Sequence, residues 1–201
     1  MPQPHSTSRP ARRGRPRSES AGSHEVILDA VYALLQKTSV RDLTMEAVAK
    51  KAGVGKPTLY KWWPSKAALV FAMFHERMAS FPPSAATRTV EETIRIRVRR
   101  LIGEFGGAFG KVMAELIAEG QSDPAVLREL FDQHIRIRRA QTVADIERAK
   151  ETGEFRADTD AETLVDELVG PLYYRMLLRI EPLDEAYGDK LIEQIMRGVR
   201  A

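Results

Sequence analysis

The sequence contains no cysteine and no long hydrophobic run. With no Cys among its 201 residues, disulfide bonds, thiolate metal sites and cysteine nucleophiles are excluded. The longest apolar stretch, residues 67–74, is far shorter than the roughly 20 residues of a membrane-spanning helix. The N-terminus is polar and rich in Arg, and it has no apolar segment of the kind found in a secretory signal. We therefore expect a cytoplasmic protein with no membrane partner.

Enzyme motifs are missing as well. The chain has no phosphate-binding loop, no glycine-rich dinucleotide motif and no GxSxG sequence. Its four histidines are scattered, and none has the spacing of a zinc-ligand pair; they are His5, His24, His75 and His134. We expect no catalytic residue, no metal site and no cofactor.

Charge is distributed unevenly along the chain. Residues 1–80 hold 13 Lys and Arg against six Asp and Glu, whereas residues 81–201 hold 18 against 22. A basic first part joined to a mildly acidic remainder indicates that one end meets a polyanion and that the other end has a different role.

Apolar residues recur with helical spacing over nearly all of the chain after residue 22, and no segment shows the alternation of a strand. Residues 1–22 lack apolar periodicity, so we expect a disordered basic arm there, with Ser23 capping the first helix. Residues 82–87 have the composition of a junction between domains. The sequence predicts an all-α fold of about nine helices, with a three-helix DNA-binding domain at 23–80 and a helical domain at 81–201.

Residues 44–62 have the pattern of two short helices joined by a tight turn. Thr44 is placed to cap the first helix, and Gly53 supplies the residue that accepts positive φ at the turn. Ala49 supplies a small side chain where the two helices approach each other. The shared core is expected to consist of Val48, Val54 and Leu59. The second helix is then free to enter a major groove.

This stretch resembles the DNA-binding domain of the TetR family of bacterial transcriptional regulators. The resemblance covers about residues 23–75 without a gap, and it is carried by Thr44, Ala47, Val48, Ala49, Ala52, Gly53, Val54, Thr58, Leu59, Tyr60, Trp63, Ser65, Lys66 and Leu69. The chain departs from the usual pattern at Gly55, at Pro57 and at the pair Trp62–Trp63. The resemblance implies that the partner is a double-stranded DNA operator.

The resemblance also implies roles for individual residues. Thr44, Tyr60 and Lys66 match positions that clamp DNA phosphates, and Thr58 matches the start of the reading helix, close to DNA. Lys56 and Lys61 have the reach for guanine edges or for phosphates, and both readings stay open. Pro57 offers only an apolar contact, for example to a thymine methyl group.

Some aromatic and basic residues of this stretch have a plainer interpretation. Tyr60 could instead be a packed aromatic with its hydroxyl at the surface. We expect Trp63 in the core, and for Trp62 both packing and a phosphate contact stay open. Lys50 and Lys51 are expected to be solvated.

A second basic element precedes the helices. Arg13, Arg15 and Arg17 belong to an Arg-Gly-Arg-Pro-Arg run that resembles the core of an AT-hook, a segment that lies along a narrow minor groove. The alternative is a basic tail that adds only salt-sensitive, unspecific affinity. We favour a minor-groove arm because the run directly precedes a DNA-binding domain.

The segment after residue 153 looks like a C-terminal domain common in the same family, in which the last two helices of each subunit pair into a dimeric four-helix bundle. The apolar residues expected in or beside this homodimer interface are Leu164, Leu168, Leu172, Leu191, Ile195 and Val199. The alternative is a role in the protomer's own core only, and we expect both roles.

A small-molecule effector is expected, although the sequence says little about its site. The candidate lining residues are Phe105, Phe109, Met113, Phe131 and His134, each of which could instead be plain core.

The sequence therefore favours a ligand-responsive repressor that binds a palindromic operator as a dimer. One alternative is a regulator of the same fold that activates transcription or responds to a protein. The other is an all-helical ligand-binding protein or enzyme with an incidental basic end.

Overall fold

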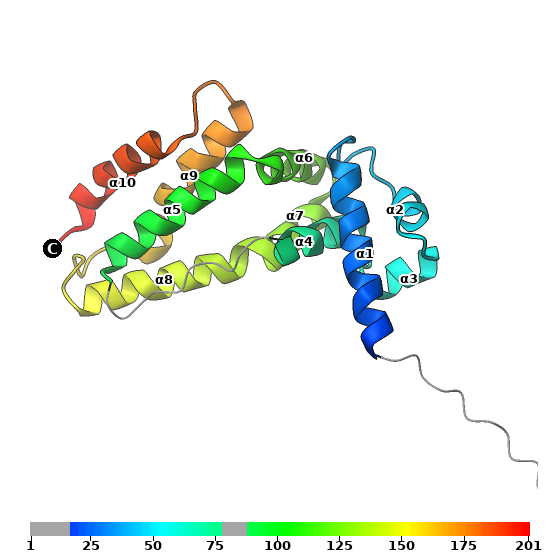
Figure 1. Ribbon diagram of the computed structural model, residues 1–201. Helices are drawn as coiled ribbons and strands as arrows, with labels where there is room; N and C mark the ends of the chain where they lie inside the picture. The colour runs from blue at the N-terminus through cyan, green and yellow to red at the C-terminus, as the bar shows by residue number, and fades with distance from the viewer. Residues whose placement is uncertain (1–16, 78–87) are drawn as a thin grey trace, which may run out of the picture.

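The computed structural model describes residues 17–77 and 88–201 of the chain (Figure 1). Within these ranges the protein is helical, and the only strand-like pairing is an isolated bridge between Phe155 and Arg200. The helices are α1 (Arg17–Leu35), α2 (Met45–Ala52), α3 (Lys56–Trp62), α4 (Lys66–Arg77), α5 (Val90–Gly106), α6 (Ala108–Ser122), α7 (Pro124–Leu130), the π-helical turn η1 (Phe131–Ile135), α8 (Arg136–Glu151), α9 (Ala161–Leu178) and α10 (Glu185–Val199). Because α7, η1 and α8 are continuous, the described chain has nine helical segments. The predicted all-α fold is confirmed.

Local capping signals fix the turn between α2 and α3. The Oγ1 of Thr44 accepts a hydrogen bond of 3.1 Å from the backbone N–H of Ala47. Gly53 ends α2 in the left-handed region, with φ of 66°, where a side chain is strained and glycine is not. The N–H of Val54 then donates to the carbonyl of Ala49 at 3.0 Å. These contacts confirm the predicted helix start and the predicted turn.

Two helix starts differ from the sequence prediction. The first helix begins at Arg17 and not after Ser23, so residues 17–22, predicted to be part of the disordered arm, are helical. A serine inside a helix costs less than about 0.7 kcal/mol relative to alanine, so Ser23 alone does not fix a boundary. The spacing of Thr159 and Glu162 predicts a capping box for α9, but its cap is Asp160, whose carboxylate accepts from the N–H of Thr163 at 2.7 Å.

The C-terminal part is organised around α5. This helix packs against α6, α8, α9 and α10, and Figure 1 shows it running alongside α9 and α10. A glycine permits the sharp corner between α5 and α6, because a Cβ on Gly110 would lie 1.9 Å from the carbonyl oxygen of Phe105. None of the described helices combines the length and apolar composition that a membrane crossing needs.

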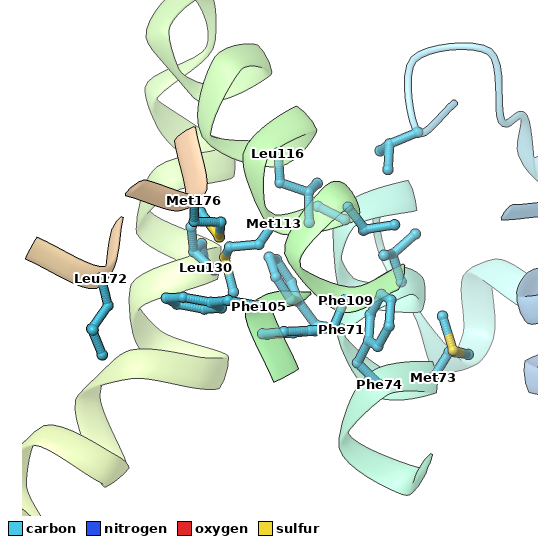
Figure 2. Close-up of a cluster of buried hydrophobic side chains, with 14 of the residues drawn as sticks. Phe71, Met73, Phe74, Phe105, Phe109, Met113, Leu116, Leu130, Leu172 and Met176 are labelled. Atoms are coloured by element: carbon cyan, nitrogen blue, oxygen red, sulfur yellow. The ribbon is translucent and has the colours of Figure 1, made fainter. Parts of the chain in front are cut away.

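One hydrophobic core connects the two ends of the molecule. Figure 2 shows Phe74 from α4 directed toward Phe109 from α6, and their ring centroids are 5.0 Å apart. The cluster continues through Met113 to Met176 on α9. Helix α4 also contacts α7 and η1. Helix α4 therefore links the C-terminal helices to α1 of the DNA-binding domain, against which it also packs.

Candidate DNA-binding surface and internal cavity

Helix α3 presents an exposed, basic face. It carries two lysines and no acidic residue. Leu59 and Val48 are fully buried, as the sequence predicted, and Val54, the third residue predicted for this core, is half-buried against it. The side chains that this packing leaves exposed or half-exposed are Lys56, Pro57, Thr58, Tyr60 and Lys61. These are the residues of α3 that were predicted to contact DNA, and they lie together on one short helix.

Tyr60 is the most prominent aromatic on this face. Its side chain is 53% exposed, which favours a role at the surface over the alternative of a packed aromatic with only its hydroxyl exposed. Its hydroxyl makes no hydrogen bond within the described part of the chain, so it is available to an outside acceptor such as a phosphate oxygen.

Lys56 is already paired. Its Nζ lies 2.8 Å from Oε2 of Glu46, a residue in the first turn of α2. The contact raises the pKa of Lys56 and lowers the pKa of Glu46, because each charge stabilises the other. Since both side chains are exposed, salt screens the pair. A DNA contact by Lys56 exchanges one anionic partner for another.

The two tryptophans behave differently. Trp63 is buried, which confirms the core position predicted for it, and the imidazole of His24 packs 4.6 Å from its ring. Trp62 is 43% exposed, and the ammonium of Lys61 lies 5.7 Å from its ring centroid. This cation–π contact holds the ammonium group of Lys61 over the ring of Trp62, on the exposed face of α3.

The remaining predicted DNA contacts lie around α3. Thr44 is exposed at the start of α2. Lys66 begins α4 and is held near the C-terminal domain, with its Nζ 3.4 Å from Oε1 of Glu119 on α6. Arg13 and Arg15 lie outside the described residues, and so does the side chain of Arg17.

A cavity of about 360 Å³ lies between α5, α8 and α9. Only His134 of the five predicted effector residues lines it. Phe105, Phe109 and Met113 are buried core residues, and Phe131 is 44% exposed. The π-helical turn explains the last two positions, because it points Phe131 outward and His134 inward. The lining residues that the sequence analysis missed are Leu101, Ile135, Arg138, Arg139, Thr142, Val165, Asp166, Val169, Gly170 and Tyr173.

The predicted interface residues fall into two groups. Leu164, Leu168 and Leu172 are buried inside the protomer, so they belong to its own core and do not face a partner. On α10, the three predicted residues are only half-buried; they are Leu191, Ile195 and Val199. The sequence did not single out a group of exposed apolar side chains near the end of α9, namely Tyr174, Leu177, Leu178 and Ile180.

A tight helix-turn-helix unit with an exposed basic second helix, joined to a helical domain with an internal cavity, defines a DNA-binding transcriptional regulator. Residues 27–73 match the family model of bacterial regulatory proteins of the tetR family. Residues 85–195 match the tetracyclin repressor-like C-terminal domain. The chain belongs to the TetR family of transcriptional regulators, which are not enzymes.

Curated relatives span nearly the same length. The HTH-type transcriptional regulator YdeS of Bacillus subtilis is 32% identical over 191 residues, which cover 95% of this chain and 96% of that protein. The regulator AqdR of Rhodococcus erythropolis is 28% identical, over 78% of this chain and 75% of that protein.

Solved structures share the fold. The TetR-family regulator SCO0332 is 33% identical and superposes with a TM-score of 0.70, over 88% of this chain and 97% of that one. FadR from Bacillus subtilis, solved in complex with stearoyl-CoA, is 17% identical, with a TM-score of 0.68 over 87% of this chain and 98% of that one.

Proposed function

We propose that this protein binds a palindromic DNA operator as a homodimer, represses transcription there, and is released by a small-molecule effector. The main support for the proposal is the exposed face of α3. Tyr60 and two lysines lie on this face, and buried Leu59 packs the helix against the core. Such a face fits a major groove, since backbone contacts from basic and hydroxyl groups position the helix and its outer residues read base edges. We expect the protein to bind this DNA in the cytoplasm.

The homodimer is supported by apolar side chains that lack cover within the protomer. Tyr174, Leu178 and Ile180 are 55%, 54% and 64% exposed near the end of α9. Leu191 and Ile195 on α10 extend the same type of surface, since both are only partly covered. Exposed apolar groups clustered in this way are typical of an interface. Helices α9 and α10 of two protomers then form a four-helix bundle that sets the two α3 helices roughly 34–36 Å apart.

Release by an effector is supported by a line of rings between the cavity and α4. His134 lines the cavity, and its ring lies 4.9 Å from that of Phe109. Phe109 lies 5.0 Å from Phe74 on α4, as Figure 2 shows. Because packed cores shift between discrete arrangements, a ligand at His134 displaces α4 and with it the spacing of the α3 helices. The FadR structure with stearoyl-CoA is a case of a ligand bound to this fold.

The basic arm is proposed to add a minor-groove contact through Arg13, Arg15 and Arg17. Deletion of residues 1–16 removes the first two of these and leaves α1 whole. The expected result is weaker operator binding, because a narrow minor groove concentrates negative potential that arginine recognises. Unchanged affinity at moderate salt, measured by fluorescence anisotropy, would contradict this role.

The test of the proposed function is selection of binding sequences from random DNA with the full chain. A dimer that reads two successive major grooves should enrich palindromes whose half-sites are one helical turn apart. The enriched site, placed before a reporter gene, should lower its expression. Enrichment without sequence preference would contradict the proposal, and higher expression from the same site would contradict the repressor role.

A further inference from the structure

The cavity between α5, α8 and α9 has a chemistry that defines the kind of ligand it takes. Its apolar walls are formed by Leu101 of α5, Ile135 of η1 and two valines of α9, Val165 and Val169. At about 360 Å³ it has room for a molecule of the size of a substituted aromatic ring. Gly170 lines the cavity on its exposed side, and a Cβ there would meet no atom within 4 Å.

The charged groups at the cavity are already engaged in ion pairs. Arg138 lies 2.9 Å from a carboxylate oxygen of Glu104, which also pairs with Arg100 at 3.0 Å. Arg139 lies 2.6 Å from Glu162 and 2.5 Å from Asp166. Three arginines are thus balanced by three carboxylates. A charged ligand gains little here, since it must break one of these pairs to form its own.

His134 is the polar group that the protein leaves without a partner. It is only 9% exposed, it lines the cavity, and its imidazole makes no hydrogen bond within the described part of the chain. No fully enclosed polar side-chain atom among the described residues lacks a partner, so the imidazole nitrogens are open to the cavity. Burial, together with Arg138 and His75, lowers the pKa of His134 to about 3. The ring is therefore neutral, with one N–H donor and one acceptor nitrogen.

Tyr173 adds a second hydrogen-bonding group to the cavity. Its ring packs edge-on against Phe105, with the centroids 4.9 Å apart, and its hydroxyl makes no hydrogen bond within the described residues. Burial raises the pKa of Tyr173 to about 12, so the hydroxyl keeps its proton and is able to donate. Together the imidazole and the phenol suit a group that both donates and accepts hydrogen bonds.

We propose that this cavity binds a neutral, mainly apolar small molecule that carries a hydroxyl group, and that the hydroxyl bonds to His134 and Tyr173. The inference rests on the proposed effector-controlled function and names the chemical class of the effector. A hydroxyl group satisfies both open groups, whereas a hydrocarbon leaves them unpaired and a carboxylate meets a neutral ring and balanced ion pairs.

The test uses 4-propylphenol, propylbenzene and 4-propylbenzoate as probes, titrated into the full chain by calorimetry. The three molecules share one shape and differ in the group offered to His134. We expect the phenol to bind at least about tenfold more tightly than either of the others. In His134→Leu the preference for the phenol over propylbenzene should fall, because one of the two partners of the hydroxyl is gone and only Tyr173 is left.

A pair of glycine variants locates the binding site. Gly170→Leu places a side chain into the open part of the cavity, whereas Gly103→Leu adds the same side chain to α5 at a position where a Cβ also meets nothing and which does not line the cavity. We expect phenol binding to weaken at least about tenfold in the first variant and to stay unchanged in the second. Thermal unfolding and molecular mass, measured on both, confirm that each is folded and equally associated.

Three results would overturn the inference: no binding of the phenol, equal or tighter binding of the benzoate, or phenol binding that Gly170→Leu leaves intact. Operator selection on the same preparations keeps the two proposals apart. A chain that selects a palindrome but does not bind the phenol fails only the ligand inference. A chain that binds the phenol but selects no DNA sequence fails the proposed function.

Discussion

The ammonium group of Lys66, the first residue of α4, lies 3.4 Å from a carboxylate oxygen of Glu119 on α6. The preceding residue repeats the pattern, because the Oγ of Ser65 donates to Glu129 of α7 at 2.7 Å. In addition, the backbone N–H of Val40 donates to Glu115. Three carboxylates of the C-terminal domain thus hold the DNA-binding domain, and one of them, Glu119, does so at Lys66, which is proposed to clamp DNA. We therefore expect operator binding and the contact between the domains to compete for Lys66.

Glu119→Gln is expected to tighten operator binding by about two- to fivefold, because a half-exposed ion pair of this kind contributes up to about 1 kcal/mol. Fluorescence anisotropy with the selected operator provides the measurement. Glu151→Gln, an equal change of charge at an exposed position near the end of α8, is the control and should have little effect. If both variants bind the operator equally more tightly, the effect comes from the change in net charge alone. Weaker binding by Glu119→Gln would contradict the competition between Glu119 and DNA for Lys66.

Tyr60→Phe is expected to weaken operator binding by about three- to tenfold and to leave the thermal stability of the protein unchanged. The hydroxyl makes no hydrogen bond within the described chain and the side chain is 53% exposed, so its removal costs the folded protein nothing. A hydrogen bond to a phosphate contributes about 0.5–1.5 kcal/mol, or more where the acceptor is charged. The loss should be uniform across operator sequences, since a phosphate contact carries no base information. A change in the preferred sequence would instead place Tyr60 on a base edge.

The helix-turn-helix unit was predictable from sequence because its determinants are local. Thr44 and Gly53 act within about one helical turn of their partners, so the spacing along the chain already contains the geometry. Asp123 and Pro124 form a start signal of the same local kind, and α7 begins at Pro124 with Asp123 as its cap.

The cavity was not predictable, since it depends on how α5, α8 and α9 meet. Helical spacing identifies an apolar face but not its partner, so it could not separate the two roles expected for Leu168, whose side chain is buried in the protomer's own core. The π-helical turn at Phe131–Ile135 also shifts the register between α7 and α8. The isolated glycine at position 170 was the one local sign of an open wall.

Leu178→Glu is expected to convert the dimer into a monomer and to weaken operator binding at least about tenfold. Leu178 is 54% exposed in the proposed interface on α9, and burying an unpaired carboxylate there costs several kcal/mol. Ile137→Glu is the matched control, since Ile137 is 58% exposed on α8, outside that surface. Light scattering reports the mass. A Leu178→Glu variant that stays dimeric would place the interface elsewhere.

Gly110→Ala is expected to destabilise the protein by about 1–3 kcal/mol, because its Cβ would lie 1.9 Å from the backbone oxygen of Phe105 and backbone cannot move aside as a side chain does. Gly103→Ala, also in a helix but with open space around its Cβ, should stabilise the protein by about 0.5–1 kcal/mol through helix propensity. Urea unfolding measures both. Similar stabilities for the two variants would show that the corner between α5 and α6 is looser than this close approach requires.

His134 should make stability depend on pH. In the folded protein burial lowers the pKa of His134 from 6.5 to about 3, so between these values the unfolded chain binds a proton that the folded chain does not. Stability is therefore fully present above about pH 6.5, and it falls by up to about 1.4 kcal/mol for each pH unit below it. His134→Leu should remove this part of the slope and leave the contribution of the carboxylates, which urea unfolding at a series of pH values would resolve. If the dependence of the unfolding free energy on pH is the same in the variant, His134 takes up a proton as readily in the folded protein as in the unfolded chain. The ring would then not be held neutral, which would contradict the donor and acceptor that the ligand inference assigns to it.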